Sequence, residues 1–228
     1  MDWIVQIIGG KYVLKELAKS LNSSELSVFQ EGQDFFLKCS DFNIAKDAKD
    51  VFEIAKKFVP ILSGATQLEL GHPLRSGNVF RINDDGTREE FGFGWGKFTL
   101  PKIFMRRSGN GAQVSNIADN VKIWVKAAKK EEKITEALTL FGSIDLNWVI
   151  LYKIFEIIGA DIQTKIYKKG WGTKAVEKRF TQTAQPHRHA KHSERLQKWK
   201  PHDNLMRFGE AKAFIQTILE NWLRTKGN

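Results

Sequence analysis

The stretch NVFRINDDGTREEFGF, residues 78–93, gives the strongest local indication of the fold. Two runs with the alternating apolar pattern of β-strands flank the dipeptide Asp85–Gly86. An Asp-Gly pair between such runs readily adopts the positive φ angles of a tight hairpin turn. The stretch is therefore predicted to be a β-hairpin, which requires a sheet in the N-terminal part of the chain.

The sequence before this hairpin supplies further strands and a first helix. WIVQII, residues 3–8, is a short apolar run that is closed by two glycines, and residues 11–21 carry apolar side chains at helical spacing. LSVFQE and DFFLKCSD lie on either side of Gly32–Gln33. This second pair of strand-like runs also predicts a hairpin.

A second helix is expected over residues 45–62, where Pro60 should bend or end it. ATQLEL, residues 65–70, and GKFTLPKIFM, residues 96–105, are expected to be strands. The order strand, helix, strand, strand, helix, strand is similar to a ferredoxin-like sandwich with an added β-hairpin.

The character of the sequence changes after residues rich in Gly, Ser and Asn. Residues 1–106 are predicted to form an α+β domain, residues 107–116 a linker, and residues 117–228 an α-helical bundle. LNWVILYKIFEIIG, residues 146–159, is apolar on nearly every side, which is typical of a helix at the centre of a bundle. The fold class is therefore α+β.

The composition indicates a protein of the cytoplasm. The chain has 228 residues and a single cysteine, Cys39, which cannot form an intramolecular disulfide. The N-terminus lacks a basic region and a small-residue cleavage site. No uncharged apolar stretch reaches the ~18–20 residues that a membrane span needs. We expect a cytoplasmic protein with no membrane contact.

The net charge of +10 is concentrated in one segment. Residues 153–200 hold 12 Lys and Arg against four Asp and Glu, whereas residues 1–110 hold 15 against 14. A clustered basic excess is what an anionic polymer requires, because each neutralised phosphate releases counterions. The charge distribution therefore predicts a nucleic-acid partner.

KIYKKGWGTKAVEKRF, residues 165–180, interleaves cations with aromatic residues. Cations can hold the phosphate backbone, and an exposed ring such as Trp171 can stack on an unpaired base. The alternative is that Trp171 belongs to the core. The candidate nucleic-acid-binding residues are Lys165, Lys168, Lys169, Trp171, Lys174, Lys178, Arg179, Lys191, Arg195 and Lys198.

The stretch QPHRHAKHSERLQKWKPH, residues 185–202, holds four of the five histidines. His187, His189 and His192 have a spacing that zinc could use, but neighbouring cations oppose a divalent metal. We therefore expect no metal and no cofactor. A solvated basic loop is the plainest alternative, and the sequence leaves open whether the stretch is helical or irregular.

A metal-independent ribonuclease needs a group that activates the 2′-hydroxyl and a cation that stabilises the phosphorane. Arg188 with His189 or His192 supplies both. Glu156, with Tyr152 one turn before it, could orient the imidazole. The alternative places Glu156 in an internal salt bridge with Lys153, or at the exposed edge of its helix.

An Arg, a polar residue and a His after a long buried helix resemble the motif of the HEPN superfamily. Members of this superfamily often cut or bind RNA in bacterial defence and toxin systems. The resemblance covers residues 116–226 and implies a bacterial RNA-binding protein, with Arg188 and His192 as catalytic residues. Only three residues separate Arg188 from His192, where the family has four to six, and one residue of slip rotates a helical side chain by ~100°.

Three functions follow from these patterns. The first is binding of RNA or single-stranded nucleic acid, with endonuclease activity as its extension. The second is a non-catalytic module for protein–protein interaction, whose helical half forms a homodimer. The third is an enzyme that acts on a small anionic metabolite. Salt-sensitive binding of oligonucleotides would favour the first, and a stable dimer without such binding the second.

Overall fold

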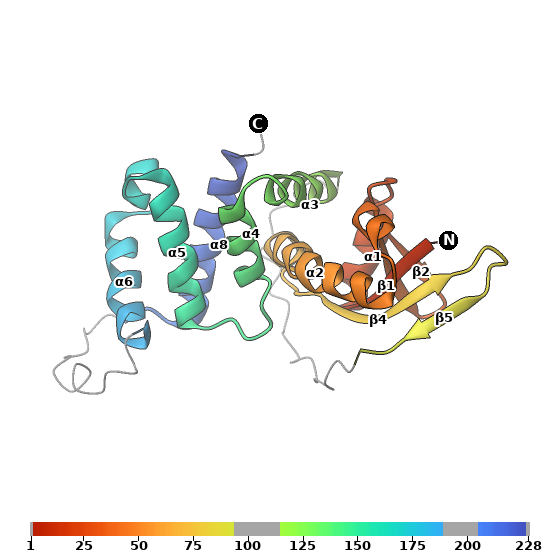
Figure 1. Cartoon of the computed structure of the whole chain (residues 1–228). Helices are drawn as coiled ribbons and strands as arrows, with labels where there is room; N and C mark the ends of the chain where they lie inside the picture. Colours follow the sequence, from red (N-terminus) through yellow and green to blue (C-terminus); the bar gives the residue numbers. More distant parts are fainter. Residues whose placement is uncertain (1, 94–114, 189–204, 227–228) are drawn as a thin grey trace. The chain divides into compact units, whose positions relative to one another are not determined.

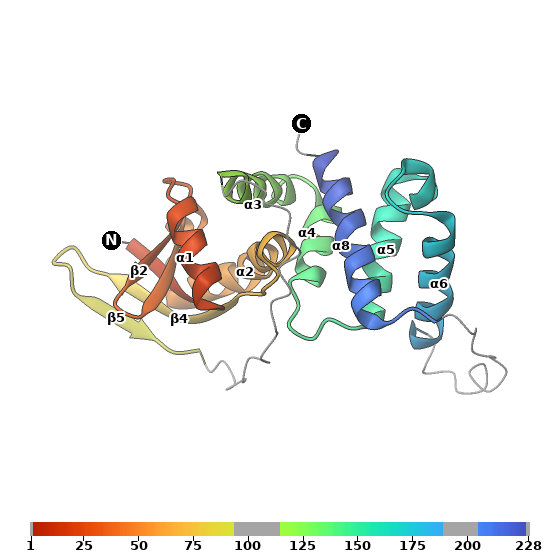
Figure 2. The same ribbon diagram turned by 180° about the vertical axis from the view of Figure 1, so that it is seen from behind.

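The computed structural model describes residues 2–93, 115–188 and 205–226 (Figure 1). The chain divides into two compact units, Met1–Val125 and Lys126–Asn228. All described strands lie in the first unit, and the described part of the second unit is helical (Figure 2). The predicted α+β class is confirmed. The predicted linker lies almost entirely outside the described residues, so its position stays a prediction.

The first unit contains a five-stranded antiparallel sheet in the order β2-β3-β1-β4-β5. Without β5, this is the strand order of a ferredoxin-like sandwich. β5 pairs with β4 as the second strand of the predicted hairpin, and β4 itself takes the fourth place in the sandwich, which the sequence assigned to residues 65–70. The strands are β1 (Asp2–Ile8), β2 (Leu26–Glu31), β3 (Asp34–Cys39), β4 (Arg75–Ile82) and β5 (Arg88–Phe91).

A hairpin turn joins β4 to β5 at the predicted place, but of the Asp85–Gly86 pair only the glycine has a positive φ angle. Gly86 has a φ angle of 82°, which a residue with a side chain rarely adopts. The carboxylate of Asp85 accepts hydrogen bonds from the amide of Thr87 (2.9 Å) and from its hydroxyl (2.6 Å). These contacts fix the register of the hairpin.

Two helices pack against the sheet. α1 (Lys11–Ser20) contacts β2, and α2 (Ala48–Leu70) contacts β4 and β1. At the centre of the sheet, Val5 pairs with Leu37 of β3 on one side and with Val79 of β4 on the other. The side chains of all three residues are fully buried. A 3₁₀ turn that was not predicted, η1 (Ser40–Ile44), follows β3.

The predictions for α2 need correction. The helix passes through Pro60 and ends at Leu70, so the expected end at residue 62 and the strand at residues 65–70 are wrong. Proline removes one backbone hydrogen bond, at a cost of about 3 kcal/mol. Ile61, Leu62, Ala65 and Leu68 are all buried after it, and their packing outweighs that cost. The strand expected at residues 96–105 lies outside the described residues.

The second unit is built around α5, which contacts α4, α6 and α8. Leu151, Ile154 and Ile158 of α5 are fully buried, as expected of a central helix. None of the described helices has the length and apolar character needed to cross a membrane. The helices after the sheet are α3 (Ser115–Ala128), α4 (Glu132–Phe141), α5 (Trp148–Ile162), the 3₁₀ turn η2 (Ile166–Lys169), α6 (Lys174–Arg188) and α8 (Phe208–Arg224).

Candidate nucleic-acid interface

Five of the predicted binding residues gather where α5 connects to α6 (Figure 1). Gln163 ends α5 in the left-handed region (φ 52°) and turns the chain into η2. One lysine caps the start of η2, two lie in its last turn, and two lie on the first turns of α6. All five are exposed. Together they are called the basic patch: Lys165, Lys168, Lys169, Lys174 and Lys178.

The charge of the basic patch is not compensated locally. Other lysines of the second unit are paired: Lys133 with Asp161 (3.1 Å) and Lys153 with Glu136 (2.6 Å). Within the described residues, no lysine of the basic patch forms an ion pair. The only acid between residues 162 and 188 is Glu177, which is buried. The patch therefore carries five exposed lysines, unpaired in the part of the chain that the structure describes, in a stretch that contains one acid, Glu177.

Arg179 and Trp171 differ from the lysines. The guanidinium of Arg179 pairs with Glu210 (2.9 Å) and donates to the carbonyl of Leu205 (2.9 Å). It thereby links α6 to the start of α8, and it is not counted in the basic patch. Trp171 is partly exposed between η2 and α6, which leaves its predicted stacking role as a prediction.

A recess of about 450 Å³ lies beside the basic patch. Its walls combine apolar side chains, two lysines of the patch and one buried carboxylate. The carboxylate belongs to Glu177, which accepts a hydrogen bond from the amide of Tyr167 (3.0 Å) and so holds η2 against α6. The lining residues are Phe155, Gly159, Gln163, Thr164, Lys165, Ile166, Lys168 and Glu177.

Of the predicted catalytic residues, the structure describes Glu156 and the backbone of Arg188, and it places Arg188 at the opposite end of α6 from Lys174. α6 continues through Pro186, so residues 185–188 are helical. Arg188 ends α6, about 21 Å along the helix from Lys174. The imidazole of His187 stacks on Trp148, with ring centroids 5.3 Å apart. The rest of the histidine stretch lies outside the described residues, including His189, Lys191, His192, Arg195 and Lys198, so their predicted roles stay predictions.

Glu156 is exposed, on one stripe of α5 with Val149 and Lys153. It lies about 12 Å along α5 from Trp148, the residue that stacks on His187. Glu156 is therefore about two turns of α5 away from the position where that helix contacts the end of α6. Its neighbour Tyr152 is buried and stacks on Phe180, with ring centroids 6.2 Å apart.

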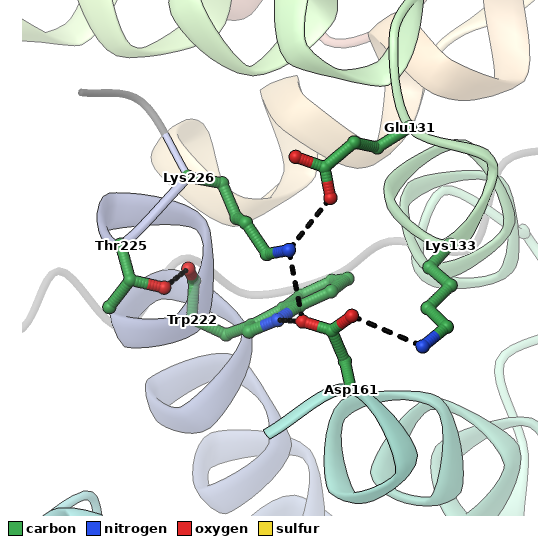
Figure 3. Close-up of polar contacts among 6 residues, drawn as sticks. All are labelled: Glu131, Lys133, Asp161, Trp222, Thr225 and Lys226. Carbon is green, nitrogen blue, oxygen red and sulfur yellow. Dashed lines mark hydrogen bonds and ion pairs between the residues drawn. The ribbon is translucent and has the colours of Figure 1, made fainter. Parts of the chain in front are cut away.

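A polar cluster that sequence reasoning missed joins the end of α5 to the start of α4 and the end of α8 (Figure 3). The carboxylate of Asp161 accepts hydrogen bonds from the indole of Trp222 (2.9 Å) and from Lys133 (3.1 Å), and it pairs with Lys226 (3.0 Å). Lys226 also reaches Glu131 (2.7 Å). Partial burial raises the pKa of the Asp161 carboxyl, but the hydrogen bonds from Trp222, Lys226 and Lys133 outweigh it and lower the pKa to about 2.

This lowered pKa predicts acid sensitivity of the second unit. The folded-state pKa of Asp161 lies below its ordinary value of 3.8, so its stabilising contribution is complete above about pH 5 and is lost as the pH falls towards 2. After allowance for solvent screening we expect a loss of about 1–2 kcal/mol. Urea unfolding at pH 7, 5 and 3 measures it.

Asp161→Asn should lower the free energy of unfolding at pH 7 and flatten its dependence on pH. Asp145→Asn is the matched control, because Asp145 is exposed and its side chain accepts no hydrogen bond from the described residues. An unchanged pH dependence in Asp161→Asn would show that the cluster does not stabilise the fold through this charge.

Comparisons with known proteins do not assign a function. No protein-family model matches the chain, and neither a curated protein nor a solved structure shows significant similarity to it. Within the described residues, His, Cys, Asp and Glu form no group of three that could hold a metal ion. The resemblance of residues 116–226 to HEPN proteins stays a prediction, and the function has to be inferred from the basic patch and the recess.

Proposed function

We propose that the basic patch binds the phosphate backbone of a single-stranded nucleic acid, RNA in preference to DNA. The supporting observation is that five exposed lysines lie together without an ion pair among the described residues. Lysines in this state attract phosphates, and each contact gains free energy from counterion release. The protein acts in the cytoplasm, where Cys39 stays a reduced, buried thiol.

The surroundings of the lysines favour an unpaired strand. Recognition of a DNA duplex usually places a helix or a β-ribbon in the major groove, whereas three of the five lysines, Lys165, Lys168 and Lys169, lie on the connection between two helices. A partly exposed Trp171 and the recess beside Lys165 and Lys168 offer apolar surface to bases that are not stacked in a duplex. Sequence-specific recognition of RNA uses such unpaired bases.

The experiment is a binding titration of a fluorescently labelled, single-stranded uridine dodecamer in EDTA. If all five lysines contact phosphates, the logarithm of the affinity should fall with the logarithm of the salt concentration with a slope of about −3.5. Raising the salt from 50 to 150 mM would then weaken binding about 50-fold. Weak binding that does not respond to salt would refute the proposal. Electrophoresis of the same samples reports any cleavage separately.

A dimerisation module is the second candidate. Ile144, Val149 and Phe208 are large apolar residues of the second unit with 39%, 48% and 37% of their surface exposed. Exposed apolar residues are common at surfaces that bind another protein. Light scattering that shows a stable dimer, together with the absence of RNA binding, would favour this candidate.

A further inference from the structure

The recess beside the basic patch has the size and the chemistry of a site for one planar polar group. Its volume of about 450 Å³ falls within the range of small-molecule sites. Phe155 and Ile166 supply apolar walls, while Lys165 and Lys168 also line the recess. A ligand that combines an apolar planar part with a nearby anionic group would match this lining.

Glu177 determines what the planar part must offer. This residue is 7% exposed and lines the recess. Its oxygen Oε2 accepts one hydrogen bond, from the amide of Tyr167, and no other described donor reaches the carboxylate. A carboxylate has about four acceptor positions, so the carboxylate of Glu177 can accept further hydrogen bonds besides the one from Tyr167. A ligand that carries hydrogen-bond donors could occupy these positions.

The nucleobases differ in how well they meet this requirement. Guanine presents two neighbouring donors, N1–H and the N2 amino group, on its Watson–Crick edge, and both can bind one carboxylate. Adenine and cytosine each present one amino group beside a ring nitrogen that would repel the carboxylate, and uracil presents one N–H between two carbonyls. Hydrogen bonds to a charged acceptor are roughly twice as strong as neutral ones.

We propose that the recess binds one unpaired guanine, with Glu177 accepting from its Watson–Crick edge and Lys165 and Lys168 contacting the phosphates beside it. This inference rests on the proposed function and adds base selectivity to it. The lysines supply affinity for any strand, and the buried carboxylate discriminates among bases.

The test compares labelled uridine octamers that carry a single central G, A or C. The wild-type protein should bind the G-containing octamer about tenfold more tightly than the other two, since a good bidentate contact is worth about 1–3 kcal/mol. Glu177→Gln should bind all three octamers with similar affinity. The amide of the introduced side chain keeps an oxygen that can accept from the Tyr167 amide, and thermal melting confirms that the variant is folded.

A parallel experiment measures the affinity for guanosine monophosphate and for adenosine monophosphate. It distinguishes recognition of a base within a strand from binding of a free nucleotide. Preference for guanosine monophosphate that is lost in Glu177→Gln supports guanine recognition even without strand binding. Equal affinity of the wild type for the three octamers, with salt dependence retained, would overturn the guanine inference and leave the proposed function standing. Binding of neither the octamers nor the nucleotides would overturn both.

Discussion

Replacing Lys168 and Lys169 together with glutamate is expected to weaken binding of single-stranded RNA at least 100-fold at 50 mM salt. Both lysines are exposed in the last turn of η2, and neither is ion-paired within the described residues. The change removes two contacts to phosphates and adds two like charges that repel the strand. Tenfold weaker binding for each lysine corresponds to about 1.4 kcal/mol, which is a modest cost for replacing an attractive contact to a phosphate with a repulsive one.

The control carries the same charge change in the first unit. Lys49 and Lys57 are exposed on α2, so Lys49→Glu with Lys57→Glu lowers the net charge equally. We expect this control to reduce the affinity less than threefold, through long-range attraction that salt screens. Anisotropy titrations at 50 mM salt measure both variants. Equal losses would mean that the total charge, and not the basic patch, attracts the strand.

Phe180→Ala is expected to lower the free energy of unfolding of the second unit by about 3–5 kcal/mol. Phe180 is fully buried on α6, and its ring lies 5.3 Å from Phe155 and 5.4 Å from Phe214, measured between ring centroids. It therefore joins α6 to α5 and α8. Removing the ring leaves a cavity between three helices that cannot all close on it.

Phe208→Ala is the matched control, because Phe208 contacts Trp148 but is 37% exposed. Its loss should cost no more than about 1.5 kcal/mol. Urea unfolding followed by tryptophan fluorescence compares the two variants with the wild type. Similar costs for both would indicate that Phe180 is not the centre of this core.

The sheet could be predicted because its signals are local. The Asp85–Gly86 signal and the strand-like runs beside it each depend on neighbouring residues, and the structure confirms that these runs pair as a hairpin, with a positive φ at Gly86. The apolar run of α5 also identified the central helix of the second unit. Such patterns act over a few residues, so the sequence displays them directly.

The predictions from the sequence were wrong or incomplete where contacts between residues far apart in the chain determine the structure. A short apolar run such as residues 65–70 fits a strand or a buried helix, and only the packing around α2 makes it helical. The contacts of Asp161 with Trp222 and of Arg179 with Glu210 join residues far apart in the chain. For Glu177, the sequence shows one acid among cations, but only the fold shows that it is buried in the wall of a recess.

The ion pair between Lys226 and Glu131 has a consequence for modularity. It joins the last described turn of the second unit to a residue near that unit's beginning, so the two ends of this unit are neighbours in space. A module with adjacent ends can be grafted into a surface loop of another protein, or circularly permuted, without stretching its framework. The second unit is therefore suited to insertion into another protein, together with its basic patch and the recess beside it.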